Sequence, residues 1–327
     1  MSSPLRVALI GTGAMGSLHA RVVSQSILTE LACVVDPDIE RGEAAAKTWG
    51  SMWKPDVESF EGIDAVIVAT PSATHLEWGL RAIEEGLPVL VEKPLSQDLS
   101  EAERLIERSE TLDVPMMCGL LERFNPAVLK MMEIVEEPIH LGVVRHSPHT
   151  PRILTGVGYD LAIHDVDLAL RLAQDVPSEV SALVSTCHPT SPPGSEDIAE
   201  IALSFSSGLL ATVSASRVSQ RKVRTVQVSE VDRLIDVDLL RRDITVYHHV
   251  GADFLHGRQT GYRQQTVIDI PAILDSREPL VAQLEHFVQL CSGQIDAASE
   301  RNSILPAHRV LDEAMRSAHR SDRLVVQ

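Results

Sequence analysis

The sequence lacks any long hydrophobic run. No stretch approaches the roughly 18 uncharged apolar residues that a membrane-spanning helix needs. The chain also reaches a charged residue at Arg6 and a glycine turn at Gly11, too early for a hydrophobic export segment. We therefore expect no membrane partner and no signal peptide, and we predict a cytoplasmic location.

Cysteine and basic residues are both scarce. The four cysteines are far apart, and two of them lie in expected core strands, so we expect reduced, buried thiols. Lysine and arginine together number 29, against 46 aspartate and glutamate residues, which gives a net charge of −17. This excess of negative charge argues against nucleic acid or an anionic membrane surface as a partner.

Several familiar motifs are also missing. The sequence has no internal repeat, no low-complexity tract, no G-x-S-x-G nucleophile elbow, no H-E-x-x-H zinc motif and no P-loop. Its 327 residues, 44% hydrophobic and 23% charged, are typical of one or two globular domains with a sizeable core.

A glycine-rich turn near the N-terminus carries the strongest positive signal. An apolar run at 7–10 leads into Gly11, Gly13 and Gly16, and helical spacing follows. This is the strand, tight turn and helix of a G-x-G-x-x-G dinucleotide site. Gly11 allows the turn, Gly13 lets a pyrophosphate approach the backbone, and Gly16 lets the helix lie close to the strand. The alternative is a glycine turn without a ligand.

A second apolar run, 31–35, ends in Asp36, 20 residues after Gly16. A carboxylate at this place can accept the hydrogens of both ribose hydroxyls and would repel a 2′-phosphate. The cofactor is therefore predicted to be NAD rather than NADP. The alternatives for Asp36 are a strand-end turn before Pro37 or a helix cap.

Strand and helix patterns alternate through residues 1–118, which predicts a doubly wound parallel sheet. From residue 119 the pattern changes. Helical segments at 125–135 and 159–172 accompany β-rich runs joined by short turns, which predicts a large open, mainly antiparallel sheet. We expect an α/β protein with an N-terminal Rossmann domain, residues 1–118, and a C-terminal α/β domain, residues 119–327. Helices at 278–291 and 306–319 close the chain.

An open sheet with an apolar face has to be covered. The helices at 125–135 and 159–172 are expected to cover one side of the C-terminal sheet. The other side is a candidate interface between copies of the chain, so we predict a homodimer or homotetramer.

Lys93 is the first candidate for proton transfer. It follows an apolar strand at 88–91 and precedes Pro94. In a closed cleft near the nicotinamide cation, desolvation would make this amine usable as an acid or base. The alternative is an ordinary surface lysine.

A second candidate lies in the helix expected at 159–172. Asp160 and His164 are one helical turn apart and share a face, so Asp160 could orient the imidazole while His164 takes or gives a proton. The alternatives are a helix-capping pair or a core histidine. A metal site from His164, Asp165 and Asp167 is disfavoured, because neighbouring residues on a helix point in different directions. We expect no metal.

The motifs together resemble those of the glucose–fructose oxidoreductase and inositol dehydrogenase (Gfo/Idh/MocA) family. The resemblance covers nearly the whole chain and depends on four segments in this order: Gly11-Thr12-Gly13-Ala14-Met15-Gly16, Ala69-Thr70-Pro71-Ser72-Ala73-Thr74-His75, Glu92-Lys93-Pro94 and Asp160-x-x-x-His164-Asp165. It implies a Rossmann domain, an α/β domain with an open antiparallel sheet, and hydride transfer between NAD and a sugar or polyol carbon.

The resemblance also implies roles for single residues. Lys93, Asp160 and His164 match the catalytic positions of the family. The implied cofactor contacts are Gly11, Thr12, Gly13, Ala14, Met15, Asp36, Arg41, Thr70, Pro71, His75, Glu92 and Lys93.

A finer likeness points to the branch that contains UDP-N-acetylglucosamine 3-dehydrogenases, which oxidise the 3-hydroxyl of the sugar. It depends on the segment 119–127 and on Pro151-Arg152, and it departs from the usual pattern at Leu120 and Tyr159. The implied substrate contacts are Arg123, Asn125, Arg152 and Tyr159. Arginine forks suit a diphosphate, although an ion pair with an acidic residue is the alternative role.

Two other functions stay open. One is a dehydrogenase for a free sugar or polyol, such as an inositol 2-dehydrogenase. The other is a cofactor-sensing regulator that keeps the fold without the chemistry, against which the intact Lys93, Asp160 and His164 argue.

Overall fold

The structure, a computed structural model, describes residues 3–151, 153–256 and 259–319, and only the backbone of those between 251 and 264. By its contacts the chain divides into two units. The first comprises Met1–Phe124 and Arg277–Arg309, and the second comprises Asn125–Ser276 and Val310–Gln327. The segment Arg277–Arg309 thus packs with the N-terminal part of the chain, from which more than 150 residues separate it in sequence.

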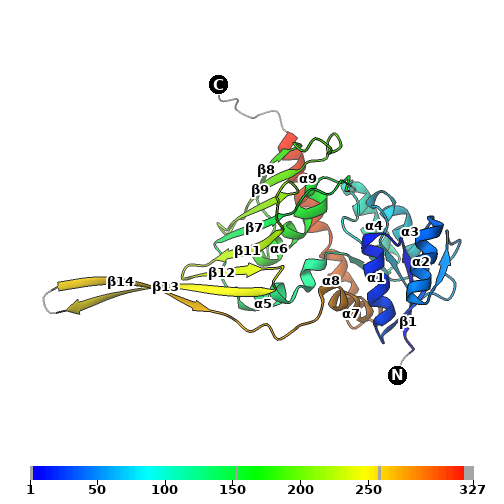
Figure 1. The fold of residues 1–327 in the computed structure, drawn as a ribbon, viewed down its shortest axis with the longest axis horizontal. Helices are drawn as coiled ribbons and strands as arrows, with labels where there is room; N and C mark the ends of the chain where they lie inside the picture. The colour runs from blue at the N-terminus through cyan, green and yellow to red at the C-terminus, as the bar shows by residue number, and fades with distance from the viewer. Residues whose placement is uncertain (1–2, 152, 257–258, 320–327) are drawn as a thin grey trace. The chain divides into compact units, whose positions relative to one another are not determined.

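The first unit is built on a six-stranded parallel sheet with the order β3-β2-β1-β4-β5-β6 (Figure 1). Its strands are β1 (Leu5–Ile10), β2 (Thr29–Val35), β3 (Met52–Lys54), β4 (Ala65–Val68), β5 (Val89–Val91) and β6 (Met116–Cys118). This is the strand order of dinucleotide-binding folds. The predicted doubly wound parallel sheet is confirmed.

Helices connect these strands. They are α1 (Ala14–Gln25), α2 (Ile39–Trp49), α3 (His75–Glu84) and α4 (Leu99–Thr111), with short helices η1 (Ser72–Thr74) and η2 (Leu121–Phe124). Helix α2 shows how local sequence sets the boundaries. The side chain of Asp38 caps its first turn by accepting from the backbone of Arg41, and Gly50 ends it in the left-handed conformation at φ 71°.

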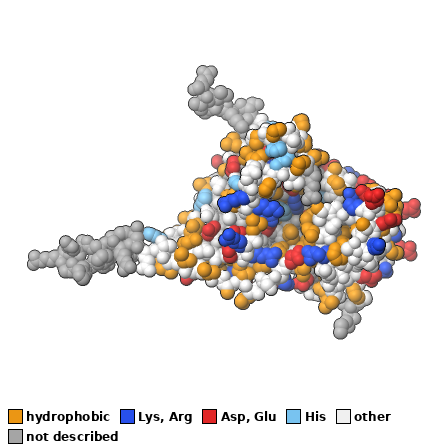
Figure 2. Space-filling model, in the orientation of Figure 1, with side chains coloured by type: hydrophobic (Ala, Val, Ile, Leu, Met, Phe, Trp, Pro, Cys, Tyr) orange, Lys and Arg blue, Asp and Glu red, His pale blue; other side chains and the backbone are white. Residues whose placement is uncertain are grey.

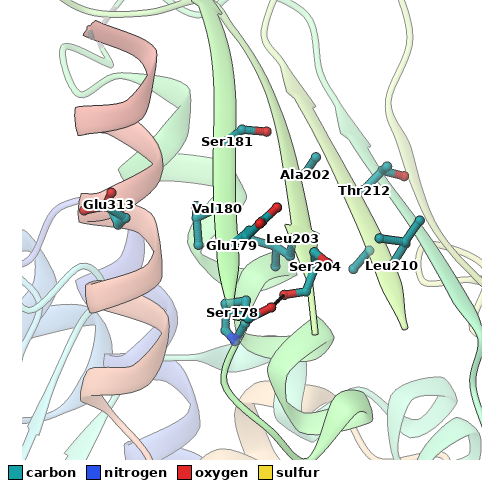
Figure 3. Close-up of a pocket in the computed structure, with 12 residues that line it drawn as sticks. Ser178, Glu179, Val180, Ser181, Ala202, Leu203, Ser204, Leu210, Thr212 and Glu313 are labelled. Atoms are coloured by element: carbon teal, nitrogen blue, oxygen red, sulfur yellow. Dashed lines mark hydrogen bonds between the residues drawn. The ribbon is translucent and has the colours of Figure 1, made fainter. Parts of the chain in front are cut away.

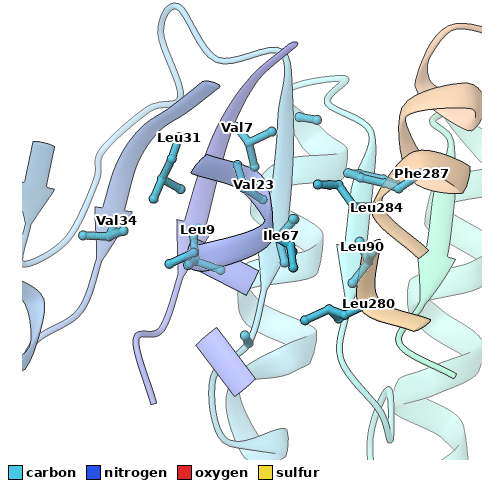
Figure 4. Close-up of a cluster of buried hydrophobic side chains, with 14 of the residues drawn as sticks. Val7, Leu9, Val23, Leu31, Val34, Ile67, Leu90, Leu280, Leu284 and Phe287 are labelled. Atoms are coloured by element: carbon cyan, nitrogen blue, oxygen red, sulfur yellow. The ribbon is translucent and has the colours of Figure 1, made fainter. Parts of the chain in front are cut away.

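The later segment of the first unit adds α7 (Pro279–Cys291) and α8 (Ala297–Asn302). Leu280, Leu284 and Phe287 recur at helical spacing on α7 and pack into the same buried cluster as Leu9 and Ile67 of the sheet (Figure 4). Burial of a large apolar side chain such as Phe287 stabilises a fold by roughly 1.5–3 kcal/mol. Burial of this apolar stripe therefore stabilises the packing of α7 in the first unit.

The second unit contains an eight-stranded sheet with the order β14-β13-β12-β11-β7-β10-β9-β8. Its strands are β7 (His140–His146), β8 (Glu179–Ser185), β9 (Ile198–Ser204), β10 (Leu210–Ser216), β11 (Val223–Ser229), β12 (Arg233–Asp238), β13 (Asp243–His256) and β14 (Gln259–Asp269). All neighbouring pairs are antiparallel except β7 and β10. The predicted mainly antiparallel sheet is confirmed.

One face of this sheet is apolar and buried, with Val143, Val213 and Val226 among its residues. Helices α5 (Pro126–Ile134) and α6 (Ile163–Ala173) pack against its strands, and Ser317 of α9 (Leu305–His319) accepts a hydrogen bond from the backbone of β8. The alternate residues of the strands point to the other face, where Leu183 and Leu210 are exposed.

The helix expected at 159–172 begins irregularly. Residues Gly158–Ala162 form a π-helical turn, η3, and the regular α-helix α6 starts only at Ile163. The predicted helical segment is confirmed, but its first turn is π-helical rather than α-helical. Single π-helical turns are rare and occur often at functional sites.

The surface charge and the state of the cysteines can both be compared with what the composition predicts. Acidic and basic side chains are interspersed on the face shown in Figure 2. All four cysteines are free thiols; Cys33 and Cys118 are buried and Cys187 is exposed. Burial raises the pKa of Cys291 to about 12. Within the described ranges, the helices are too short or too polar to cross a membrane.

Candidate active site

The glycine turn after β1 fits a dinucleotide. Gly11 has φ +89°, and a Cβ there would lie 2.7 Å from the carbonyl oxygen of Ala69. A Cβ on Gly16 would lie 2.0 Å from the carbonyl oxygen of Gly11. A Cβ on Gly13, in contrast, would have no protein atom within 4 Å. Gly11 and Gly16 are thus required by the protein's own packing, whereas Gly13 leaves open space.

That open space lies at the start of α1. Gly13 is the N-cap of this helix, and no side chain caps its first turn. The first backbone N–H groups of a helix have no partner within the helix, and the helix dipole favours an anion there. Gly13, Ala14 and Met15 therefore form a suitable cradle for the diphosphate of a dinucleotide.

Asp36 lies at the end of β2 with 2% of its surface exposed. One carboxylate oxygen accepts hydrogen bonds from the backbone N–H and the hydroxyl of Thr12, at 2.8 and 2.7 Å. Arg41 donates to both oxygens, at 3.0 and 2.7 Å. Burial raises the pKa of Asp36, but the hydrogen bonds from Arg41 and Thr12 outweigh it and hold the pKa well below its ordinary value. Asp36 is therefore a fixed negative charge beside the glycine turn.

His75 joins the ends of β4 and β5. Its Nδ1 lies 2.8 Å from the carbonyl oxygen of Pro94, and its Nε2 lies 2.8 Å from that of Thr70. Burial lowers the pKa of His75, and the two carbonyl groups partly offset this effect. The histidine thereby fixes Thr70 and Pro71, after β4, next to the segment that carries Lys93.

The carboxylate of Glu92, the residue before Lys93, also has two contacts within the protein. Its carboxylate lies 2.8 Å from Nε2 of His19 on α1, and both side chains are buried. The same carboxylate accepts a hydrogen bond of 3.2 Å from the backbone N–H of Lys93. His19 was missed in the sequence; only its position, one turn after Gly16 on α1, could have indicated it.

The residues that follow Lys93 are also fixed by a contact with a buried side chain. The Lys93–Pro94 peptide bond is cis. The backbone N–H of Leu95 donates to Nε2 of His308, at 3.1 Å. Lys93 thus stands at the carboxyl end of β5, on the same sheet edge as Gly11 and Asp36, in a turn whose backbone is bound by buried side chains. No local signal in the sequence indicated His308.

In the second unit, Asp160 lies in the π-helical turn and His164 lies one turn further, on α6. The guanidinium of Arg217 is 3.6 Å from the carboxylate of Asp160. The residue after His164, Asp165, forms a buried ion pair with Arg145 of β7, with N–O distances of 2.7 to 3.0 Å. This pair fixes the rotation of α6 and therefore the direction in which His164 points. Arg145 and Arg217 were missed in the sequence.

The four expected substrate contacts differ in burial and in their hydrogen bonds within the protein. Arg123 is 7% exposed, donates to the hydroxyl and the carbonyl group of Ser303, and lies 3.7 Å from Glu300. Asn125 caps α5 and donates to the carbonyl group of Leu239. Tyr159 lies in the π-helical turn and is partly exposed. Arg152 lies outside the described residues.

A pocket of about 720 Å³ lies on the second unit, where the strands β8, β9 and β10 meet Glu313 of α9 (Figure 3). Serine, threonine and aliphatic side chains form most of its wall, and none of the expected site residues lines it. The described residues also contain no group of three histidine, cysteine or acidic side chains placed to hold a metal ion.

Comparison with known proteins identifies the family. Residues 5–120 match the model of the Gfo/Idh/MocA oxidoreductase family with an NAD-binding Rossmann fold, and residues 144–229 match the C-terminal domain of that family. The chain is 31% identical over 287 residues to UDP-N-acetylglucosamine 3-dehydrogenase of Acidithiobacillus ferrooxidans, covering 87% of this chain and 88% of the relative. This chain belongs to the Gfo/Idh/MocA family. The predicted family, oxidoreductase class and cofactor NAD are confirmed.

The similarity of this chain to known Gfo/Idh/MocA proteins extends over nearly its whole length. The crystal structure of the Acidithiobacillus enzyme has a TM-score of 0.80 at 28% identity and covers 97% of this chain and 99% of its own. The NAD-dependent scyllo-inositol 2-dehydrogenase of Bacillus subtilis is 26% identical over 332 residues, 93% of this chain and 96% of the relative.

Proposed function

We propose that this protein oxidises the 3-hydroxyl of a nucleotide sugar of the UDP-N-acetylglucosamine type with NAD. The observation that carries the proposal is the position of Lys93 at the carboxyl end of β5, on the sheet edge that also holds the glycine turn and Asp36. An amine at this edge suits proton transfer to or from a substrate hydroxyl next to the nicotinamide ring.

The first unit would hold the cofactor, which accepts the hydride when bound. The N-terminus of α1 would bind the diphosphate, and Asp36 the ribose hydroxyls. In the described structure, Arg41 and Thr12 occupy the carboxylate of Asp36. The side chain of Arg41 is 50% exposed, so it can turn outward and release an oxygen for the ribose.

Two groups are proposed for the proton. Lys93 in the first unit, or His164 in the second, takes the hydroxyl proton, and Asp160 orients the imidazole. The fixed turn around Lys93 and the Arg145–Asp165 pair next to His164 support both as pre-positioned groups.

The substrate assignment draws on the 31% identical relative, which is named for UDP-N-acetylglucosamine. Arg123 and Asn125 use polar atoms within the protein, so we propose that Arg152 and Tyr159 supply the direct substrate contacts. The second candidate substrate is a free polyol. The guanidinium of Arg123, one of two arginines expected to bind a diphosphate, is instead bound by Ser303 and Glu300. This contact favours a substrate without a diphosphate, such as a free polyol.

We further propose a homodimer or homotetramer through the open face of the eight-stranded sheet, and a cytoplasmic location. The exposed Leu183 and Leu210 on that face support the interface. Sedimentation at micromolar concentration checks it: a dimer or tetramer is expected, and a monomer would contradict the proposal.

The decisive experiment measures NAD reduction with UDP-N-acetylglucosamine and with myo-inositol, for the wild type, Lys93→Ala and the exposed control Lys47→Ala. Turnover of the nucleotide sugar is expected. Lys93→Ala should keep NAD binding and lose about 10²–10⁴-fold in kcat, while Lys47→Ala behaves as wild type. Turnover of inositol alone would favour the second candidate. NAD binding without any turnover would favour a cofactor-sensing regulator.

A further inference from the structure

Arg217 is a buried cation that the known chemistry of the chain does not explain. It follows β10 and is 3% exposed. Its guanidinium donates to the carbonyl oxygens of Ile153 and Thr155 and forms an ion pair of 3.6 Å with the carboxylate of Asp160. A buried charge is costly without a charged partner, so the ion pair to Asp160 is part of what allows an arginine here.

The π-helical turn that carries Asp160 is held at its first residue, Gly158, by Glu196. The carboxylate of Glu196 accepts a hydrogen bond of 2.9 Å from the backbone of Gly158, and its carbonyl oxygen accepts one of 3.0 Å from Val157. A Cβ on Gly156 would lie 2.1 Å from this carboxylate, and one on Gly158 would lie 2.9 Å from it. The turn therefore fits closely around Glu196.

Arg217 and Glu196 are connected to each other through one short segment. The backbone N–H of Arg217 donates to the carbonyl oxygen of Asp197, at 2.9 Å, and Asp197 directly follows Glu196. Asp197 is itself fully buried and accepts from Ser191 and from two backbone N–H groups. Glu196 and Arg217 thus hold the first residue of the π-helical turn, Gly158, and Asp160 in its middle, and a backbone hydrogen bond connects these two supports.

We propose that Arg217 is a positioning residue for Asp160 and His164: its guanidinium holds the side chain of Asp160 in one orientation within the π-helical turn. This inference deepens the proposed function and depends on His164 being the group that takes the proton. The positive charge of Arg217, beside Asp160, would also oppose a second positive charge on the imidazole of His164 one helical turn away.

Other charged groups lie on the elements around the turn. The segment before β9 carries Glu196 and Asp197, and α6 carries Asp165, Asp167 and Arg171. Helix α9 packs on Gly158 through Met315 and carries Glu313 and the ion pair of Arg316 with Asp312, and Arg145 comes from β7. Arg145 and Asp165 neutralise each other in their own ion pair. Removal of the charge of Arg217 consequently leaves a net negative environment, which favours the protonated imidazole.

The test compares Arg217→Gln and Arg217→Met, which remove the charge, with Arg217→Lys, which keeps it. Arg233→Met is the matched control, because Arg233 of the same sheet also pairs with a carboxylate, that of Glu230, and donates to a carbonyl group, that of Ile134. The readouts are kcat, KM and the pH profile of kcat, with folding checked by circular dichroism.

For whichever neutral variant folds, kcat is expected to fall roughly tenfold, the size that one oriented charge interaction can carry. The acid limb of the kcat profile should move to higher pH, with the Kd for NAD unchanged. Arg217→Lys should keep the wild-type acid limb. A neutral variant with the profile of Arg233→Met would overturn the inference. Wild-type turnover by His164→Ala would instead remove the dyad from the proposed function.

Discussion

Nε2 of His308 accepts a hydrogen bond of 3.1 Å from the backbone N–H of Leu95, a residue 213 positions earlier in the chain. Both residues are buried. Because Nε2 must accept, the imidazole proton lies on Nδ1, which is 3.0 Å from the carbonyl oxygen of Ile304. The first turn of α9 therefore supports the turn that carries Lys93 through one defined tautomer.

His308→Leu should destabilise the protein by about 1–3 kcal/mol, because it leaves the buried N–H of Leu95 without an acceptor. His308→Gln can supply an amide oxygen in its place and should lose less stability and less kcat. Unfolding in urea and steady-state kinetics measure the two effects. His286→Leu, at a partly exposed histidine bound to Glu300, serves as the control. Equal losses in the Leu and Gln variants would show that the acceptor at this position does not matter.

The parts of the fold that could be predicted are those encoded in contiguous residues. The apolar runs, the glycine spacing after β1 and the caps of α2 each depend on neighbours in the sequence, so the parallel sheet and its ligand-binding edge could be inferred. The return of α7 to the first unit could not be inferred, because an apolar stripe on a helix does not specify which core it packs against. Only packing against residues such as Leu9 and Ile67 decides between them.

The same limit applies to the supports of the candidate site. Pairs such as Arg145–Asp165 and Arg217–Asp160 join residues far apart in sequence, and no local pattern marks the partner. The role of an arginine cannot be inferred from the sequence around it either. Arg123 could equally well have met a phosphate, and its engagement depends on Ser303 and Glu300, residues that fold back from the other end of the chain.

Asp36→Ala should weaken NAD binding by roughly tenfold to a hundredfold, because the ribose loses hydrogen bonds to a charged acceptor. The same change frees Arg41, whose guanidinium suits a 2′-phosphate, so discrimination against NADP should relax. Kd values for NAD and NADP measure both effects. Asp38→Ala, which removes the cap of α2, should cost about 1 kcal/mol of stability and leave the NAD to NADP ratio unchanged. Unaltered affinities in Asp36→Ala would refute the ribose role.

Asp36 should also make the free energy of unfolding depend on pH in the acid range. Its folded-state pKa is below the ordinary value of 3.8, so the carboxylate adds stability at neutral pH, and this stability is lost as the pH falls below about 4 towards the folded-state pKa. Asp36→Asn cannot titrate. The difference in unfolding free energy between wild type and Asp36→Asn should therefore be largest at neutral pH and shrink in acid. A difference that stays constant down to the acid transition would contradict a depressed pKa.

Gly13 and Gly16 offer a matched pair that separates ligand binding from folding. In Gly16→Ala, the new Cβ would lie 2.0 Å from the carbonyl oxygen of Gly11, so α1 must shift away from β1 and stability should fall. In Gly13→Ala, the Cβ meets no protein atom within 4 Å, and Gly13 already has negative φ. This variant should lose at most about 1 kcal/mol, from the poorer N-cap.

The methyl group of Gly13→Ala would nevertheless occupy the space that a diphosphate needs beside the helix N-terminus. We expect its Kd for NAD to rise by about tenfold or more, a loss equivalent to at least about 1.4 kcal/mol of binding free energy. Titration with NAD and unfolding in urea give the two quantities for each variant. If Gly13→Ala bound NAD as tightly as the wild type, the diphosphate could not lie against this turn, and the cofactor site would have to be sought elsewhere on the sheet edge.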